Sequence, residues 1–225
     1  MRSSIYGTGR SSTPEATMIK RVVKSVGGSS VSAKGVAVLV SMIRHVFVEI
    51  TLMTSTFKER APKQTLTARD IQFAVRLVLG GTELAKHAIV QGMAAVQRGS
   101  TQGPMIKVSY VKRCLKSSML YARMGRGTPI YLAAVLEYIL AEVLELSLNV
   151  AREQKKTIIA PNHIRTAIQN DNELFGLFDK VIIAGAGAVS HMPLNGRDHF
   201  VSSHPSIPPP NDPSDSFSKL SIQNY

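Results

Sequence analysis

The chain has 225 residues, enough for one domain or two small ones, and 44% of them are hydrophobic, which predicts a packed core. Its 27 Lys and Arg outnumber its 15 Asp and Glu, and the net charge of +12 at pH 7 indicates an anionic polymer or surface as partner. The single cysteine, Cys114, excludes an intramolecular disulfide framework, and no segment requires a membrane, because the N-terminus lacks the apolar core of a secretory signal and charged residues interrupt the apolar run from Val36 to Thr54.

The first elements in chain order are an arm, a short helix and a long helix. Residues 1–13 are rich in Ser, Gly and Thr, so we expect a disordered arm. Pro14 begins a helix that runs to about Ser25, with Lys20, Arg21 and Lys24 on its outer face. A long helix follows from about Ser32 to Arg60, because apolar residues recur there at the helical period, at Val36, Leu39, Val40, Ile43, Phe47, Ile50, Met53 and Phe57.

Two further helices are expected before a linker. Gln64 to Leu66 is a brief extended piece, and Thr67 with Asp70 forms a capping box that starts a helix through Leu79. Another helix extends from Glu83 to about Arg98 and ends where Gly99 to Pro104 reads as a linker. Its expected inward side chains are Leu84, Ala88, Met93 and Val96.

The same order of elements returns after the linker. A short basic helix is expected from about Val108 to Lys116, and a long helix from Pro129 to Glu153, with Thr128 as its N-cap. The polar side chains of the long helix fall within about 160° of arc, so it needs cover on most sides. Lys155 to Ile159 is a brief extended piece, and Pro161 starts a helix to Asn170. The layout predicts an internal repeat of short, long and short helices, whose units cover each other.

The last part of the chain changes in composition. Residues 181–194 are apolar but interrupted by glycine, which predicts an extended segment that docks on another surface. From residue 195 to 225, Pro, Ser, Asp and Asn dominate, and we expect a disordered tail.

The positive charge is concentrated in one stretch of the chain. Between Leu84 and Leu136 there is no acidic residue, whereas a surface that served solubility alone would mix the two signs. The cations inside this window are Lys86, Arg98, Lys107, Lys112, Arg113, Lys116, Arg123 and Arg126.

Both halves of the chain resemble histones. The stretch TLTARDIQFAVRLVLGGTELAKHAIVQGMAAV resembles histone 2B, and RMGRGTPIYLAAVLEYILAEVLELSLNVAREQKKT with PNHIRTAIQNDNELFGLF resembles histone 2A. The fused order is similar to the histone doublets of large DNA viruses. The resemblance implies an all-α chain of two tandem histone folds, residues 14–98 and 105–180, paired as an intramolecular handshake dimer across a linker at residues 99–104.

The resemblance also implies a set of residues that contact double-stranded DNA. Arg123 lies where histone 2A inserts an arginine into the minor groove, and Lys63 takes the corresponding position in the 2B half. Together with phosphate-facing cations of the first helices and loops, the expected DNA-binding residues are Lys20, Arg21, Lys24, Lys34, Lys63, Lys112, Arg113, Lys116, Arg123, Arg126, Lys155 and Lys156.

The resemblance is incomplete at three places. Ile158 stands where histone 2A carries another inserting arginine, so we expect looser wrapping of DNA. The arm lacks the long lysine-rich tail of histone 2B. The histone acidic patch maps onto Glu83, Glu137, Glu142, Glu145, Asp171 and Glu173, but Gln91 and Asn172 replace two of its acids, which predicts a weaker docking surface.

Three classes of function compete. The first is a structural DNA-packaging protein that acts with histone 3 and histone 4 type partners and a second copy of itself, in a virion, a viral factory or host chromatin. The second is a histone-fold heterodimerisation module of a transcription or DNA-binding complex. An enzyme is not expected, because the six histidines show no spacing with Cys114 or the acids that would build a metal site or a catalytic triad. His87 and His163 are expected to pack or cap helices, and we expect neither a cofactor nor a metal.

Overall fold

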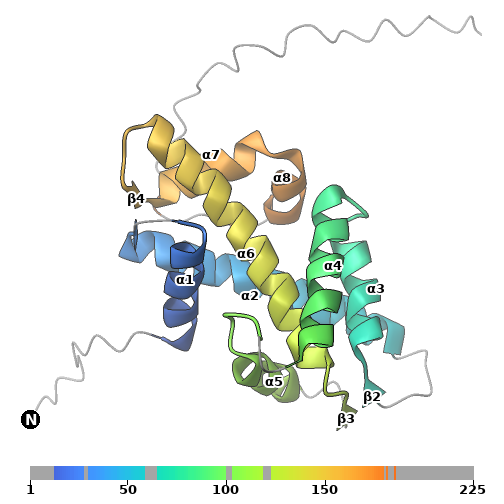
Figure 1. Cartoon of the computed structure of the whole chain (residues 1–225). Coiled ribbons are helices and arrows are strands. Elements are labelled where there is room, and N and C mark those ends of the chain that lie inside the picture. Colours follow the sequence, from blue (N-terminus) through green and yellow to red (C-terminus); the bar gives the residue numbers. More distant parts are fainter. Residues whose placement is uncertain are drawn as a thin grey trace, which may run out of the picture. The chain divides into compact units, whose positions relative to one another are not determined.

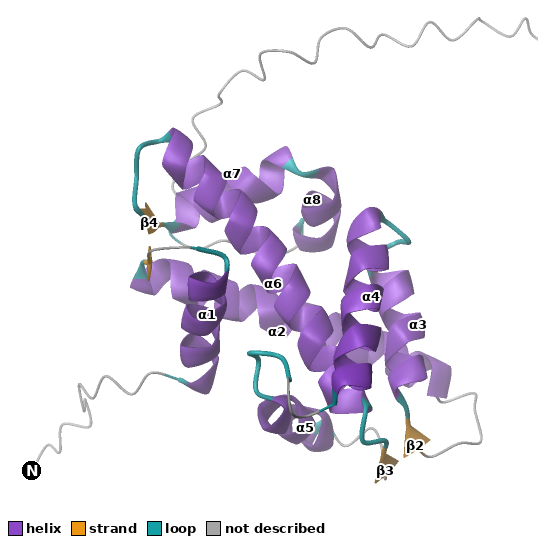
Figure 2. Cartoon of the chain, in the orientation of Figure 1, coloured by secondary structure: helices purple, strands orange, loops and turns teal. Residues whose placement is uncertain are grey.

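Helices make up almost all of the structure, a computed structural model that describes residues 13–27, 30–58, 65–99, 103–118, 123–179, 181 and 185 (Figures 1 and 2). These residues belong to one compact unit, which spans residues 1–188. Its helices are α1 Pro14–Ser25, α2 Ala33–Lys58, α3 Ala68–Val78, α4 Glu83–Arg98, α5 Val108–Ser117, α6 Thr128–Glu153, α7 Pro161–Asn170 and α8 Asn172–Phe178. The described residues also include four strands of two residues each: β1 Ser30–Val31, β2 Thr65–Leu66, β3 Arg123–Met124 and β4 Ile158–Ile159.

Side-chain caps define where several helices begin. An oxygen of each cap residue accepts a hydrogen bond from a backbone N–H of the first turn, which would otherwise lack a partner. Thr13, Thr67, Thr82 and Asp171 cap α1, α3, α4 and α8 in this way. The expected capping box of α3 is confirmed, because the Thr67 N–H also donates to the Asp70 carboxylate at 2.7 Å.

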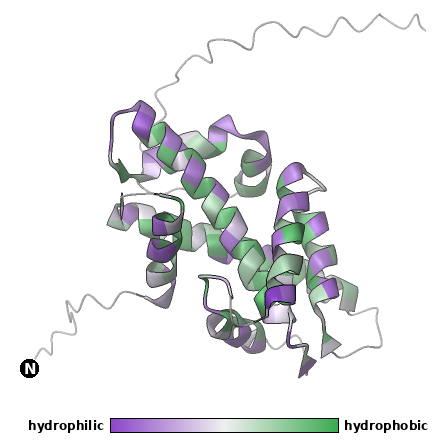
Figure 3. Ribbon diagram, viewed as in Figure 1, coloured by the Kyte–Doolittle hydropathy of each residue, from purple (hydrophilic) through white to green (hydrophobic). Residues whose placement is uncertain are grey.

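Helix α6 is the element around which the others pack (Figure 1). It contacts α4, α7, α5, α3, α1 and α2, and residues on most of its sides are buried. Leu132, Ile139 and Ala151 are fully buried near its beginning, middle and end. The prediction that this long helix needs cover on most sides is therefore confirmed. Buried apolar residues of the surrounding helices form one core cluster with those of α6, and Figure 3 colours the ribbon by hydropathy.

Two short parallel strand pairs join segments that are far apart in the sequence. In β1 and β4, Ser30 lies opposite Ile158, and in β2 and β3, Thr65 lies opposite Arg123. Each pair therefore ties a loop of the first half to a loop of the second half.

The N-cap predicted for α6 is wrong. Gly127 is the cap residue, while Thr128 is buried in the first turn, and its hydroxyl donates to the Leu66 carbonyl at 3.0 Å. The Thr128 hydroxyl bonds to another element because the β2–β3 pair brings the Leu66 carbonyl next to the start of α6. This acceptor comes from the other half of the chain.

One expected inward side chain of α4 points out. Leu84 and Ala88 are buried and Val96 is half-buried, as predicted, but Met93 is 43% exposed. Gly92 takes the inward position instead, because the Tyr131 ring of α6 packs against it so closely that a Cβ on Gly92 would lie 2.7 Å from the ring. Met93 is displaced outward, where its sulfur accepts a hydrogen bond from the Gln72 amide at 3.6 Å.

Helix α2 is a core helix with an unusually apolar composition. Among the described helices, residues Ala33–Phe57 are long and apolar enough to cross a membrane by length and composition alone. The helix contacts α1, α3, α6 and α7, and Leu39, Met42 and Ile50 are buried against them. These contacts account for the buried apolar residues of the helix, whereas Val48, Leu52 and Phe57 are 50%, 60% and 42% exposed.

Parts of the predicted organisation fall outside the described residues. The arm up to residue 12, residues 100–102 of the linker, Lys63 and the tail from residue 195 are among them. Of the predicted docking segment at residues 181–194, only Val181 and Gly185 are described. Val181 packs against the core, and its N–H donates to the Phe178 carbonyl at 3.0 Å.

Candidate nucleic-acid interface

The cations of α1 lie on the face opposite its buried side. Lys20, Arg21 and Lys24 are exposed, while Met18, Ile19, Val22 and Val23 are buried. This division follows from the helical period of the sequence, which alternates apolar and basic residues along three turns. The helix therefore presents a basic surface to solvent.

Helix α5 presents a second basic surface close to the first. Lys112, Arg113 and Lys116 are exposed, and the Arg113 guanidinium lies 5.6 Å from the centre of the Tyr110 ring. Its N-cap residue, Lys107, makes no side-chain cap hydrogen bond, so backbone N–H groups at this helix start remain available for an anion. The two surfaces are neighbours, because the Lys107 N–H donates to the Met18 sulfur at 3.4 Å.

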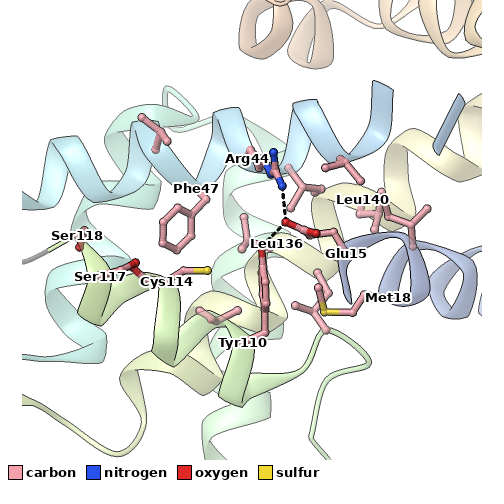
Figure 4. A pocket seen from close by; sticks show the side chains of 16 residues that line it. Glu15, Met18, Arg44, Phe47, Tyr110, Cys114, Ser117, Ser118, Leu136 and Leu140 are labelled. Carbon is pink, nitrogen blue, oxygen red and sulfur yellow. Dashed lines mark hydrogen bonds and ion pairs between the residues drawn. The ribbon is translucent and has the colours of Figure 1, made fainter. Parts of the chain in front are cut away.

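A carboxylate that the sequence analysis did not single out joins these two helices. Glu15 of α1 accepts hydrogen bonds from Arg44 of α2 and from the Tyr110 hydroxyl of α5, both at 2.6 Å (Figure 4). Partial burial opposes ionisation of Glu15, but these two hydrogen bonds outweigh it and lower its pKa to about 2. Glu15 is therefore an anion held between the elements, and its charge is balanced by that of Arg44 in an ion pair.

The strand pairs bring further cations to two other places. Arg123 and Arg126 are exposed at and after β3, which pairs with β2. At the other pair, Lys155 and Lys156 are exposed in the turn before β4, and Lys34 is exposed in the first turn of α2, which follows β1. The structure thus gathers most of the expected DNA-binding residues around α1, α5 and the two strand pairs, whereas Lys63 lies outside the described residues.

The turn before β4 holds Lys155 in an uncommon backbone conformation. Its φ angle is 53°, in the left-handed region that favours glycine. The turn closes α6, since the Lys156 N–H donates to the Ala151 carbonyl at 2.8 Å. The backbone of Lys155 is therefore strained, and its side chain adds a positive charge at the turn. Ile158, where an arginine was expected from the resemblance, is 50% exposed close by.

Acidic side chains form a separate surface on α4, α6 and α8. Burial raises the pKa of Glu142, and the nearby charges of Glu145 and Asp171 raise it further, so these three carboxylates lie close together. Glu173 accepts hydrogen bonds from the N–H groups of Glu83 and Leu84, at 3.2 and 2.8 Å, and so caps the start of α4.

Glu137, the sixth residue expected in the acidic patch, is engaged elsewhere. Its half-buried carboxylate accepts a hydrogen bond from the Ile106 N–H at 3.0 Å and another from Met105. Burial raises the pKa of Glu137, while these hydrogen bonds and the charge of Arg98 lower it. Its carboxylate therefore holds the backbone that leads into α5.

The titratable groups outside these surfaces have structural roles. His163 is buried, and its Nδ1 accepts a hydrogen bond from the Ala160 N–H at 3.1 Å, so the expected capping histidine is confirmed. His87 is exposed and lies against the Tyr138 ring, with 3.3 Å between its Nδ1 and the hydroxyl. Within the described ranges, no group of three or more His, Cys, Asp or Glu side chains is placed to hold a metal ion.

Comparison with known proteins gives matches to histones of more than one kind. The family model of the core histone domain, which describes histones 2A, 2B, 3 and 4 together, matches residues 9–77. Histone 2B.v1 of Dictyostelium discoideum is 32% identical over 202 residues, which covers 77% of this chain and 89% of that protein. Histone 2A-IV of Volvox carteri is 48% identical over 101 residues, 45% of this chain and 78% of its own length. A probable histone 2A of Oryza sativa subsp. indica is 47% identical over 107 residues, which covers 47% of this chain and 79% of that protein.

These matches give different parts of one chain two kinds of histone relative. Histone 2B-like and histone 2A-like similarity extends over different parts of the chain. Core histones are not enzymes, in agreement with the expectation from the histidine spacing. An all-α fold, exposed basic surfaces and a match over most of a known histone together show that the chain belongs to the core histone family.

Proposed function

We propose that this chain packages double-stranded DNA as a histone 2B and histone 2A doublet. Residues 14–98 and 105–180 would each form one histone fold, and the linker at residues 99–104 would let them pair as a handshake dimer within one molecule. The two parallel strand pairs support this arrangement, since each joins a loop of one half to a loop of the other. The cap that Glu173 provides for α4 supports it at a third place.

The observation that carries the proposal is the position of the cations beside these strand pairs. Arg123 lies in the β2–β3 pair, and Lys155 and Lys156 directly precede the β1–β4 pair. Paired loops present backbone N–H groups and cations to the same stretch of phosphates, which gives strong binding with little sequence preference. Histone octamers bind in this way, with arginines inserted into the minor groove, and we assign that role to Arg123.

The basic surfaces of α1 and α5 would make a third contact with the DNA backbone. Lys20, Lys24, Lys112 and Lys116 are among the exposed cations there, and the open start of α5 offers N–H groups to a phosphate. Glu15 does not offset these cations, because its charge is balanced by Arg44.

An apolar surface on α3 supports the proposed histone 3 and histone 4 type partners. Phe73 is 54% exposed and Leu77 is 53% exposed, one helical turn apart. Large apolar side chains on one face typically mark a contact with another protein. A partner at this face, with a second copy of the chain in the same particle, would complete a nucleosome-like core.

The acidic surface would be a smaller docking site than the resemblance alone predicts. Glu142, Glu145 and Asp171 lie together, but the carboxylates of Glu137 and Glu173 accept hydrogen bonds from backbone N–H groups of the chain itself. We infer that basic anchors of a partner dock there weakly.

The cellular setting we propose is chromatin, with the virion or viral factory as the specific case suggested by the fused order. The match to the Dictyostelium discoideum histone covers 77% of this chain, more than either proposed half. Similarity to a histone of a cellular organism is thus not confined to one proposed half, which supports chromatin association more strongly than a viral setting.

The experiment that tests the proposal is nuclease protection of DNA of about nucleosomal length, with this chain alone and with a histone 3 and histone 4 type partner. A protected fragment of discrete size that requires the partner is the expected result. Protection without discrete size in both mixtures would mean non-specific coating. If neither mixture protects DNA, the heterodimerisation module is the better description. Affinity measured against salt is the second test, and packaging predicts a steep fall.

A further inference from the structure

An apolar groove with a volume of about 390 Å³ lies between α1, α2, α5 and α6, apart from the cations assigned to DNA (Figure 4). Its walls come from side chains such as Ile43, Phe47, Val111 and Leu136. Val48 at the groove is 50% exposed, so apolar surface remains in contact with water. This volume is within the range of about 300–1,000 Å³ that ligand-binding sites occupy.

Most polar groups that line the groove already make hydrogen bonds within the chain, so the groove offers an occupant mainly apolar surface. At one end, the Glu15 carboxylate is held by Arg44 and the Tyr110 hydroxyl. At the other end, the Ser117 hydroxyl donates to the Cys114 carbonyl at 2.9 Å, and the Ser118 hydroxyl donates to the Leu115 carbonyl at 2.6 Å. An occupant would therefore be held through apolar surface and not through hydrogen bonds.

The length of the groove indicates an occupant of one or two large side chains. Tyr110 and Ser117 line it from opposite ends of α5. They are seven positions apart, so the distance between them along the helix axis is about 10 Å. Two adjacent residues of an extended segment span about 7 Å, so a pair of neighbouring apolar side chains fits this length.

The chain contains such a pair directly before the groove. Residues 1–12 precede Thr13, which is two positions from Glu15 in the groove wall. In this segment, Ile5 and Tyr6 are adjacent, and apart from Met1 the other residues are small, polar or charged. The eight residues from Ile5 to Thr13 reach up to about 29 Å, well beyond the length of the groove. A segment tethered this closely has an effective concentration on the order of millimolar.

We propose that the groove is the docking site of the chain's own N-terminal segment, and that Ile5 and Tyr6 are the side chains that enter it. Docking would fix the start of the chain beside α1 and α5. It would also place Arg10 near the basic surfaces of those helices, without adding a contact inside the groove.

A disulfide between the segment and the groove tests this proposal. Cys114 is the single cysteine of the chain and lines the groove, and Gly7→Cys adds a second thiol beside the intact pair of Ile5 and Tyr6. Under mild oxidation with oxidised glutathione, we expect rapid cross-linking within one molecule, because a disulfide requires a Cα separation of about 4.4–6.8 Å. The matched control carries Gly7→Cys together with Ile5→Ser and Tyr6→Ser, and it should cross-link about tenfold more slowly.

Two outcomes of this experiment would overturn the proposal. Equal rates with and without Ile5 and Tyr6 would show that these side chains do not hold the segment. Cross-linked dimers as the main product would show that the occupant comes from a second copy.

A second measurement uses the natural cysteine alone: Ile5→Ser with Tyr6→Ser should raise the reaction rate of Cys114 with a soluble thiol reagent about tenfold. An unchanged rate would likewise reject docking.

Discussion

The hydroxyl of Tyr131 is a buried polar group without a hydrogen-bond partner among the described residues. Burial raises its pKa to about 12, although the charge of Arg76 acts in the opposite direction. Removing a hydroxyl from water without a new partner costs about 1–3 kcal/mol. We therefore expect Tyr131→Phe to raise the free energy of unfolding by about 1 kcal/mol, measured by urea denaturation. Tyr131→Leu, which also removes the packed ring, should lower it, and a loss of stability in Tyr131→Phe would show that the hydroxyl is satisfied.

His163 should make stability depend on pH. Burial lowers its pKa from the ordinary 6.5, and the charge of Lys156 lowers it further, while a backbone hydrogen bond raises it. The folded chain thus binds this proton less readily than the unfolded chain, so the contribution of His163 is present above about pH 6.5 and is lost as pH falls toward the lowered pKa.

The matched variant for this effect is His163→Gln, which can accept the same bond from Ala160 but does not titrate. Between about pH 7.5 and pH 5, the unsubstituted chain should lose more unfolding free energy than the variant, measured by denaturant titration at each pH. The raised pKa values of Glu137 and Glu142 act with the opposite sign, but they do so equally in both proteins. A constant difference between the two proteins would contradict the prediction.

At the scale of elements, local signals predicted most helix boundaries. Glu83–Arg98 and Pro161–Asn170 were expected where α4 and α7 lie, because caps and helix-starting prolines act within one turn of the helix end. Thr128 was wrongly predicted as a cap, since its hydroxyl bonds to Leu66 of the other half. Helix α8 was not predicted, because seven residues with an internal Gly176 are too short to show a period, although Asp171 before Leu174 is a cap signal that could have revealed it.

The contact between α4 and α6 depends on a glycine. A Cβ at position 92 would lie 2.7 Å from a Tyr131 ring atom, and this ring is buried in the core. We expect Gly92→Ala to lower the free energy of unfolding by about 1–3 kcal/mol, because overpacking forces the ring or the helix to move. Thermal unfolding would measure the change. Gly176→Ala in α8 is the matched control, since nothing lies within 4 Å of its added Cβ, and it should be neutral or stabilising. Equal effects of the two substitutions would rule out the ring contact as the cause.

At the scale of the whole molecule, the sequence predicted where the cations lie, but not which side chains contact one another. The cations of α1 and α5 follow from helical period, and those of the loops follow from the resemblance. The cluster of Glu15, Arg44 and Tyr110 could not be predicted, because Arg44 and Tyr110 are 29 and 95 positions from Glu15 and only packing brings them together. The engagement of Glu137 by the Ile106 backbone could not be predicted either, because it depends on the path of the chain after the linker.

The proposed function predicts the effect of restoring a cation beside the β1–β4 pair. Ile158 is exposed and close in sequence to Lys155 and Lys156. If this edge contacts DNA, Ile158→Arg should strengthen binding at low salt and steepen the dependence of log affinity on log salt by about one. Ile158→Gln is the control, because it is polar without a charge. The same slope for both variants, measured by fluorescence anisotropy, would place this edge away from the DNA.

The strand pairs and the Glu173 cap connect segments of one covalent chain. Their formation is therefore a first-order event, and dilution cannot separate the two halves as it separates a dimer of free subunits. The ratio of the two halves is fixed when the chain is synthesised, and the segments that these contacts join always belong to the same molecule. Midpoints of thermal unfolding should accordingly be the same at nanomolar and micromolar protein.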